Sequence, residues 1–152
     1  MSQAHHFHAI QSTITFLTNF DSWKKKWIII ALLFIITAII LGAFGAHALK
    51  EIIHENERLV SFETGVRYQL LHGIALLILP FIAKQFEIDT KWVFRLLIMG
   101  VLFFSCSIYL LTMRDVWQLG GITKILGPIT PIGGLLMILG WSLLLIKIVR
   151  KP

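Results

Sequence analysis

The chain has 152 residues, of which 57% are hydrophobic and only 14% are charged, so it carries too few polar side chains to cover a soluble core of its size. Lys and Arg outnumber Asp and Glu by 14 to 8, but no basic stripe with interleaved aromatic residues lies outside the apolar segments, which argues against a nucleic acid partner. A single cysteine, Cys106, excludes an intramolecular disulfide. The composition predicts one compact domain in a lipid bilayer.

Residues 1–23 are typical of a polar N-terminal tail. The spacing of His5 and His8 is one that can hold a metal ion, and His6 lies between them. An exposed tail that never orders is the commoner case for such a segment. We therefore assign no metal site to it.

The first apolar segment, residues 27–46, contains no charged residue. At about 1.5 Å of rise per residue it spans roughly 30 Å, the thickness of the hydrocarbon core of a bilayer, and it is predicted to be a transmembrane helix. Together with the lysines at 24–26 and the Ala-His-Ala sequence at 46–48, which has the small-x-small pattern of a cleavage site, it also imitates a secretory signal. Because the apolar segment is longer than the core of such a signal, we expect it to be retained.

Small residues recur along the end of this segment. Ala38, Gly42 and Ala46 are spaced four residues apart and so fall on one face of a helix, and Gly45 widens that face. Small residues on one face let a neighbouring helix approach closely in a membrane. The first helix is therefore predicted to be central in the bundle.

Residues 50–67 are polar with apolar residues at helical spacings, which predicts a short surface helix before the second crossing. The apolar segment 68–83 is short for a crossing. We therefore expect the second helix to begin near Ser61, with Glu63 and Arg67 paired at i and i+4 in the interface.

Two further uncharged segments cover residues 96–113 and 125–146. The second of these opens with glycines and prolines, of which Gly133 and Gly134 are expected to serve helix packing. Proline is tolerated in the first turn of a helix, because its missing N–H would have no partner there. The prediction is an all-α integral membrane four-helix bundle over residues 24–152, with crossings at about 27–48, 61–83, 92–113 and 128–149.

The charges predict the orientation of this bundle. The N-terminal side, the 84–95 turn and the C-terminus share one side and hold 9 of the Lys and Arg residues, and the other two loops hold 5. By the positive-inside rule, both termini are expected to be cytoplasmic.

This topology gathers the unusual polar residues in one layer at the outer face, where we expect any ligand to bind. The candidate residues of this layer are His47, Glu63, Arg67, Tyr68, Gln69, His72, Tyr109 and Thr130.

Two of these candidates, His47 and His72, are expected at comparable depth, near the end of the first helix and one turn into the second. Ionisable groups at membrane depth are costly and point to function, and facing histidines can ligate haem or a metal ion or hydrogen-bond a quinone. A structural interpretation is equally coherent. His47 would favour the negative end of a helix dipole, and His72 would hydrogen-bond across the bundle. We favour the structural interpretation and assign no cofactor.

Three functions stay open. The favoured one is a non-catalytic membrane protein that associates with itself or with a larger membrane complex. The second is a haem-, quinone- or metal-binding protein that uses His47 and His72, and the third is a small transporter or channel. No catalytic site is predicted, because no acidic residue lies in an apolar segment and no nucleophile has an adjacent base.

Four segments resemble the signature blocks of a small family of bacterial membrane proteins, domain of unknown function 423, to which eukaryotic transmembrane protein 256 is similar. The segments are 42–49, 62–72, 105–110 and 129–134. The resemblance extends over about residues 27–149 and implies a four-helix inner-membrane protein without an established activity. Cys106 replaces a frequent glycine and Arg67 a frequent glutamine, so a site at that corner is expected to differ here.

Overall fold

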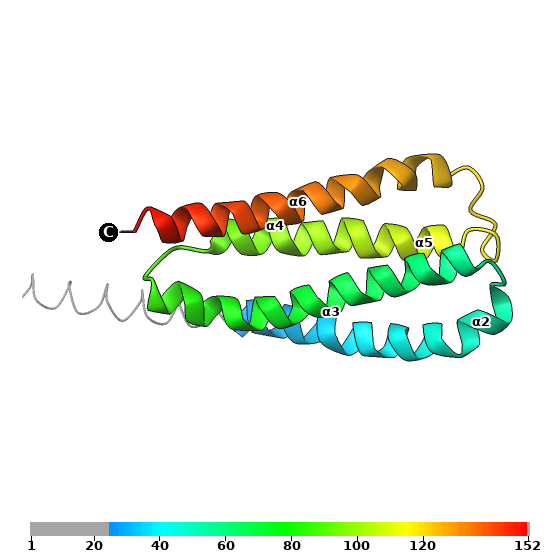
Figure 1. Cartoon of the computed structure of the whole chain (residues 1–152), viewed down its shortest axis with the longest axis horizontal. Helices are drawn as coiled ribbons and strands as arrows, with labels where there is room; N and C mark the ends of the chain where they lie inside the picture. The colour runs from blue at the N-terminus through cyan, green and yellow to red at the C-terminus, as the bar shows by residue number, and fades with distance from the viewer. Residues whose placement is uncertain (1–24, 152) are drawn as a thin grey trace, which may run out of the picture.

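The computed structural model describes residues 25–151 and consists of helices joined by short connections (Figure 1). No strand occurs within these residues. Four helical segments are long and apolar enough to cross a membrane: Lys25–Ala46, Asn56–Gln85, Lys91–Thr112 and Thr123–Val149. The predicted all-α architecture with four crossings is confirmed. The polar tail predicted for residues 1–23, with its histidines, lies outside the described residues.

The third crossing is interrupted, whereas the other three are continuous helices. The first crossing is followed by the short helix α2 (Ala48–Ile52) and then by the second crossing, α3 (Asn56–Gln85). The third crossing consists of α4 (Lys91–Val101), a π-helical turn (Leu102–Cys106) and α5 (Ser107–Thr112), and the fourth crossing is α6 (Thr123–Val149).

Helix α3 begins at Asn56, not near Ser61 as the polar sequence had suggested. Its additional turns are stabilised by contacts that a local pattern does not reveal. The Arg58 side chain is buried and forms an ion pair with Asp115, which follows α5. Phe62, only 2% exposed, packs in a cluster with Leu49 of α2. The surface helix expected over residues 50–67 is therefore mostly the start of α3, and only α2 is a separate short helix.

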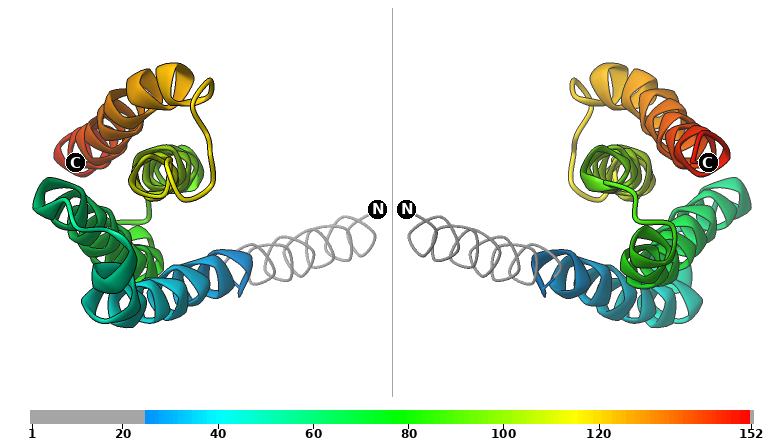
Figure 2. Two further views of the ribbon diagram at one scale, coloured as in Figure 1. Left: turned by 90° about the vertical axis from the view of Figure 1, so that its right-hand side faces the viewer. Right: turned by 90° about the vertical axis from the view of Figure 1, so that its left-hand side faces the viewer.

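The crossings form an open arc (Figure 2). The third crossing lies in the middle, with α3 against one side and α6 against the other. Helices α3 and α6 have little backbone contact with each other. Helix α2 lies at one end of the arc, and the C-terminus lies at the opposite end (Figure 1). The arc thus has two flanking helices, α3 and α6, and a floor formed by the third crossing.

Small residues set the closest approach between α6 and the third crossing. A Cβ atom added to Gly133 would lie 2.7 Å from the carbonyl oxygen of Gly100, and it would also meet the backbone nitrogen of Phe104 in the π-helical turn. A Cβ added to Gly140 would lie 2.7 Å from the Leu97 side chain. By contrast, a Cβ on Gly134 would meet nothing within 4 Å. Of the two neighbouring glycines, only Gly133 lies in the helix contact.

The first crossing packs along α3 through residues spaced seven apart. Ala31 and Ala38 are fully buried, and a Cβ on Gly45 would lie 2.8 Å from the Phe62 ring. Gly42 lies at the edge of this contact, where its Cβ would be 3.4 Å from Val66. Ala46, the third member of the predicted stripe, lies exposed. Small residues do mediate this contact, but their spacing is that of a left-handed helix pair.

Candidate functional site

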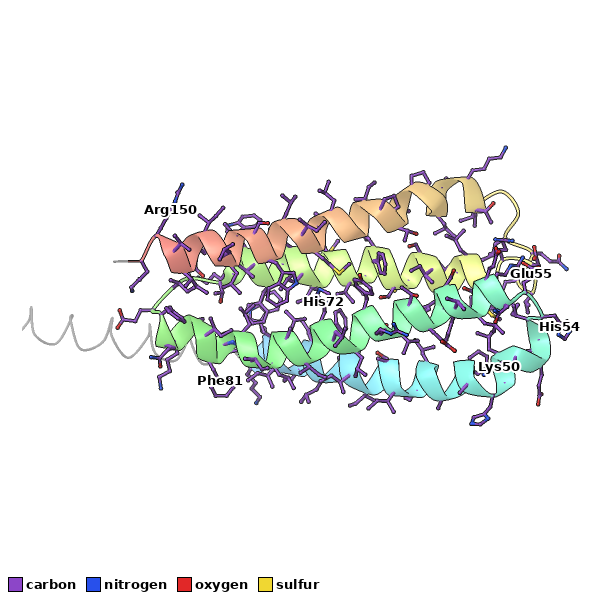
Figure 3. The ribbon with its side chains drawn as sticks, in the orientation of Figure 1. Lys50, His54, Glu55, His72, Phe81 and Arg150 are labelled. Carbon is purple, nitrogen blue, oxygen red and sulfur yellow. The ribbon has the colours of Figure 1, made fainter. Side chains whose placement is uncertain are left out.

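The structure separates the two histidines that the sequence had placed at comparable depth. His47 lies exposed in the turn between the first crossing and α2, at the end of the arc. His72 lies 16 residues after Asn56 in α3, which puts it roughly 24 Å along the helix, near its middle (Figure 3). The expectation was wrong because α3 starts earlier than predicted. A haem, quinone or metal ion held by both side chains at once is therefore not supported.

His72 instead connects the two flanking helices. Its Nδ1 lies 2.9 Å from the carbonyl oxygen of Tyr68, and Trp141 of α6 donates from Nε1 to its Nε2 over 3.2 Å. Because Nε2 accepts this hydrogen bond, Nδ1 carries the proton and donates to the carbonyl oxygen, and the ring is neutral. Both ring nitrogens are thus engaged within the protein. The contact joins α3 to α6 near the middle of their length, and the gap between the two helices lies between this contact and the start of α3.

A buried glutamine connects three crossings. Gln69 of α3 is 7% exposed, and its amide nitrogen donates to Thr37 Oγ1 (2.6 Å) and to the carbonyl oxygen of Phe34 (3.0 Å) in the first crossing. The Tyr109 hydroxyl of α5 donates to Gln69 Oε1 over 2.9 Å. Such hydrogen bonds hold helices together in an apolar medium. Gln69 and Tyr109 of the predicted layer therefore lie in direct contact, in a structural role.

The π-helical turn directs two serines to opposite sides of the third crossing. Ser105 donates to the carbonyl oxygen of Gly65 in α3 over 2.9 Å, and it is 1% exposed. The Ser107 hydroxyl lies 3.0 Å from the carbonyl oxygen of Phe104 and 2.7 Å from Thr130 Oγ1 of α6. The Phe104 carbonyl oxygen in the π-helical turn thus accepts both the backbone N–H and the hydroxyl of Ser107. The floor of the arc is thus hydrogen-bonded to both flanking helices.

A cluster of charges lies where α3 begins. The buried guanidinium of Arg58 lies 2.7 Å from Glu55 Oε2 and forms an ion pair with Asp115. Arg114 lies 3.9 Å from both carboxylates. The hydrogen bond from Arg58 lowers the pKa of the Asp115 carboxyl below its ordinary value, and the positive charges of Arg58 and Arg114 act in the same direction. This cluster ties the loop after α5 to the start of α3.

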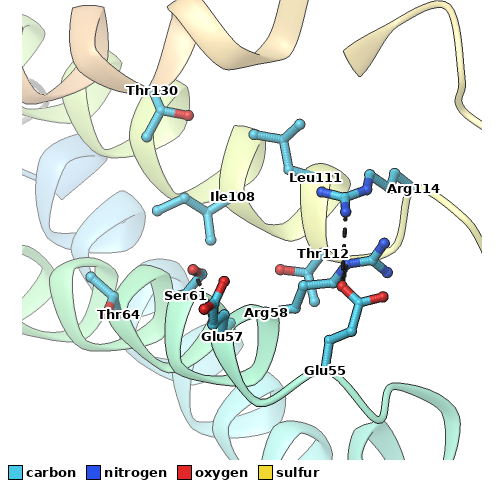
Figure 4. A pocket seen from close by; sticks show the side chains of 10 residues that line it. All are labelled: Glu55, Glu57, Arg58, Ser61, Thr64, Ile108, Leu111, Thr112, Arg114 and Thr130. Atoms are coloured by element: carbon cyan, nitrogen blue, oxygen red, sulfur yellow. Dashed lines mark hydrogen bonds and ion pairs between the residues drawn. The ribbon is translucent and has the colours of Figure 1, made fainter. Parts of the chain in front are cut away.

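A cavity of about 470 Å³ opens between α3, α5 and α6 next to this cluster (Figure 4). We call it the α3/α6 groove. Glu55, Arg58 and Arg114 lie at its charged end, and hydroxyl groups line its inner part (Figure 4). The hydroxyls of Ser61 and Thr64 donate to carbonyl oxygens of their own helix, over 2.8 and 2.9 Å. Its complete lining is Glu55, Glu57, Arg58, Ser61, Thr64, Ile108, Leu111, Thr112, Arg114 and Thr130.

Only one member of the predicted polar layer, Thr130, lines the α3/α6 groove. Glu63 and Arg67 are both exposed, and within residues 25–151 they form no ion pair with each other. The sequence had also given no special weight to Arg58, Ser61 or Thr64. A signal was present, because the hydroxyls at 61 and 64 share one helix face with Glu57, but the partners across the groove come from distant segments.

Comparison with known proteins gives the chain its family. A model of the family described as protein of unknown function (DUF423) matches residues 41–134. A UPF0382 membrane protein of Staphylococcus aureus (strain bovine RF122 / ET3-1) is 40% identical over 122 residues, which cover 80% of this chain and 93% of that protein. Relatives with the same description in Staphylococcus haemolyticus and Staphylococcus epidermidis are 40% and 37% identical, over 81% and 83% of this chain and 94% and 97% of their own lengths.

No solved structure matches the chain. The four crossings agree with the description of these relatives as membrane proteins. The predicted resemblance is confirmed, and the chain belongs to the DUF423 family of membrane proteins.

Proposed function

We propose that this protein is a non-catalytic membrane protein that associates, through the α3/α6 groove, with a second copy of itself or with a larger membrane complex. The single observation that carries the proposal is the open arc, whose groove places hydroxyl groups and a charged cluster between two helices that have little contact with each other. The partner element would be a transmembrane helix.

The chemistry of the groove favours a helix over lipid chains as the occupant. Lipid tails are as apolar as leucine, so helices associate in membranes by close packing and by interhelical hydrogen bonds. Ser61 and Thr64 have donated their protons within α3, and their oxygens keep lone pairs that can accept a hydrogen bond. Lipid tails offer no donor for these lone pairs, whereas a polar side chain of a partner helix does.

The charged end of the groove has weakly paired groups. The Arg114 side chain is 41% exposed and lies 3.9 Å from the carboxylates of Glu55 and Asp115, a distance at which each ion pair is weak. Glu57 forms no ion pair within residues 25–151. A partner helix with charges near its end would therefore meet a weakly paired cation and a carboxylate that is unpaired among the described residues, and these would fix its register.

Native mass spectrometry of the full chain, released from mild detergent or nanodiscs, tests this proposal. We expect assemblies larger than the monomer, and we expect Thr64→Trp to reduce them because the indole fills the groove. Ile74→Trp is the matched control, since Ile74 is 44% exposed on the same helix and lies outside the groove. A protein that stays monomeric and captures no membrane protein, or equal effects of the two variants, would contradict the proposal.

We further propose that both termini are cytoplasmic, as the distribution of Lys and Arg predicts, and that the membrane is the inner (cytoplasmic) one, as the resemblance to the family implies. In a Cys106→Ala background, His54→Cys and Lys151→Cys place thiols at opposite ends of the arc. A membrane-impermeant maleimide is expected to label position 54 in intact cells, and position 151 only after the membrane is opened. The reverse pattern would invert the orientation.

A further inference from the structure

The end of α6 near the C-terminus carries a second groove, separate from the first. A cavity of about 370 Å³ opens there between α6 and the connection from α3 to α4. Ile88 and Asp89 of that connection line one side. The α6 residues Leu143, Ile146 and Lys147 line the other, together with Arg150 and Lys151, which follow the helix. We call it the basal groove.

The α6 side of the basal groove changes from apolar to basic along one helix face. Leu143, Ile146, Lys147 and Arg150 are spaced i, i+3, i+4 and i+7, so they lie one above the other. Toward the middle of the membrane the face is apolar, and toward the end of the helix it is cationic. A phospholipid has the same polarity along its length, with acyl chains toward the middle of the membrane and a phosphate at the membrane surface.

Among the described residues, the two cations of this face have no acidic partner. Lys147 and Arg150 form no ion pair within residues 25–151. The neighbouring Lys151 differs, because its Nζ lies 3.0 Å from Glu87 Oε2 and 3.3 Å from the Glu87 carbonyl oxygen. That ion pair holds the chain after α6 against the α3–α4 connection. The carboxylate of Asp89, the one acidic group lining the groove, accepts a hydrogen bond from the Lys91 backbone N–H over 3.0 Å.

The surroundings place the basal groove at the depth of lipid headgroups. Trp92, 61% exposed at the start of α4, carries Arg95 over its ring at 4.8 Å, and exposed tryptophans mark the membrane interface. Of the described Lys and Arg residues, this end of the arc holds Lys25, Lys26, Lys84, Lys91, Arg95, Lys147, Arg150 and Lys151, and its acidic residues are Glu87 and Asp89. The excess of positive charge favours an anionic ligand.

We propose that the basal groove is a binding site for an anionic phospholipid, with the phosphate on Lys147 and Arg150 and an acyl chain along Leu143 and Ile146. Two unpaired cations provide the charge that the lipid phosphate needs, and the apolar face below them provides the contact that a free phosphate ion would not use. The site requires no partner protein and is independent of the function proposed for the α3/α6 groove.

Native mass spectrometry with titrated lipids tests the proposal on the full chain. Phosphatidylglycerol is expected to bind at least tenfold more tightly than phosphatidylcholine, and the double variant Lys147→Gln/Arg150→Gln is expected to weaken phosphatidylglycerol binding about tenfold. The matched control is Lys50→Gln/Lys124→Gln, which removes the same charge from exposed positions outside the groove. Equal thermal unfolding of both variants and the native chain would show that the fold is unchanged.

Inorganic phosphate distinguishes the two possible sources of the anion. If the lipid is the ligand, millimolar phosphate leaves phosphatidylglycerol bound, and the Leu143→Ser variant binds phosphatidylglycerol more weakly than the native chain does. Complete displacement by phosphate, equal binding of the two lipids, or equal losses in the double variant and its control would each overturn the proposal.

Discussion

Replacement of Gly133 by alanine tests the contact that holds α6 in the arc. The added methyl group would lie 2.7 Å from the carbonyl oxygen of Gly100 and 2.9 Å from the carbonyl carbon of Phe103. The favourable distance between such atoms is about 3.5 Å or more. All the nearest atoms belong to backbone, so no side chain can rotate away, and α6 must move outward by the better part of an ångström.

The expected cost follows from this geometry. Overpacking of a tight contact costs about 1–3 kcal/mol, and the better helix propensity of alanine returns up to about 1 kcal/mol. Gly134→Ala receives the same gain in propensity without the clash, because nothing lies within 4 Å of its Cβ. The difference between the two variants therefore isolates the clash, and it should be about 1–3 kcal/mol.

Unfolding by SDS in mixed micelles measures this difference. Gly133→Ala should unfold at a lower SDS fraction than Gly134→Ala, which should match or exceed the native chain. Equal midpoints for the two variants would refute the reasoning, because they would show that α6 and the third crossing do not touch at Gly133.

Two other predictions concern polar contacts. Tyr109→Phe should lower the free energy of unfolding by about 0.6 kcal/mol, the average for hydrogen bonds between membrane helices, and by about 1.7 kcal/mol at most, because Gln69 Oε1 loses its donor. Tyr68→Phe is the matched control, since its hydroxyl forms no hydrogen bond within residues 25–151. Equal losses in the two variants would contradict the network. Because folding lowers the pKa of Asp115, its contribution to stability is present above the unfolded pKa of about 3.9 and is lost as the pH falls through the folded value. Thermal unfolding in detergent should therefore depend less on pH between about 4 and 2 in Asp115→Asn than in the native chain, and identical pH profiles would count against the ion pair with Arg58.

The crossings were predictable because lipid imposes a simple rule on sequence. A segment such as 27–46, uncharged over the thickness of the bilayer, has one structural solution, a helix. The start of α3 was not predictable in the same way. Its charged residues suggested a loop or a surface helix, and the ion pair that buries Arg58 connects it to Asp115, 57 residues later in the chain.

The packing details also depended on partners that a pattern does not specify. Ala38 and Ala46 look alike in sequence, yet Ala38 is fully buried and Ala46 is exposed. Gly133 and Gly134 differ in the same manner. The π-helical turn at Leu102–Cys106 has no marker in the sequence, although it orients Ser105 and Ser107. These features depend on which face of each helix meets a neighbour.

The central claim is that the α3/α6 groove, on the α2 side of the contact between His72 and Trp141, receives another transmembrane helix. Photocrosslinking in native membranes tests it most directly, with benzoylphenylalanine placed at Thr64 in the groove or at Ile74 outside it. The claim predicts a crosslinked product of defined mass, either a dimer of this chain or its adduct with one membrane protein, at position 64 and none at position 74. Lipid adducts alone at both positions, or the same protein adduct at both, would contradict it.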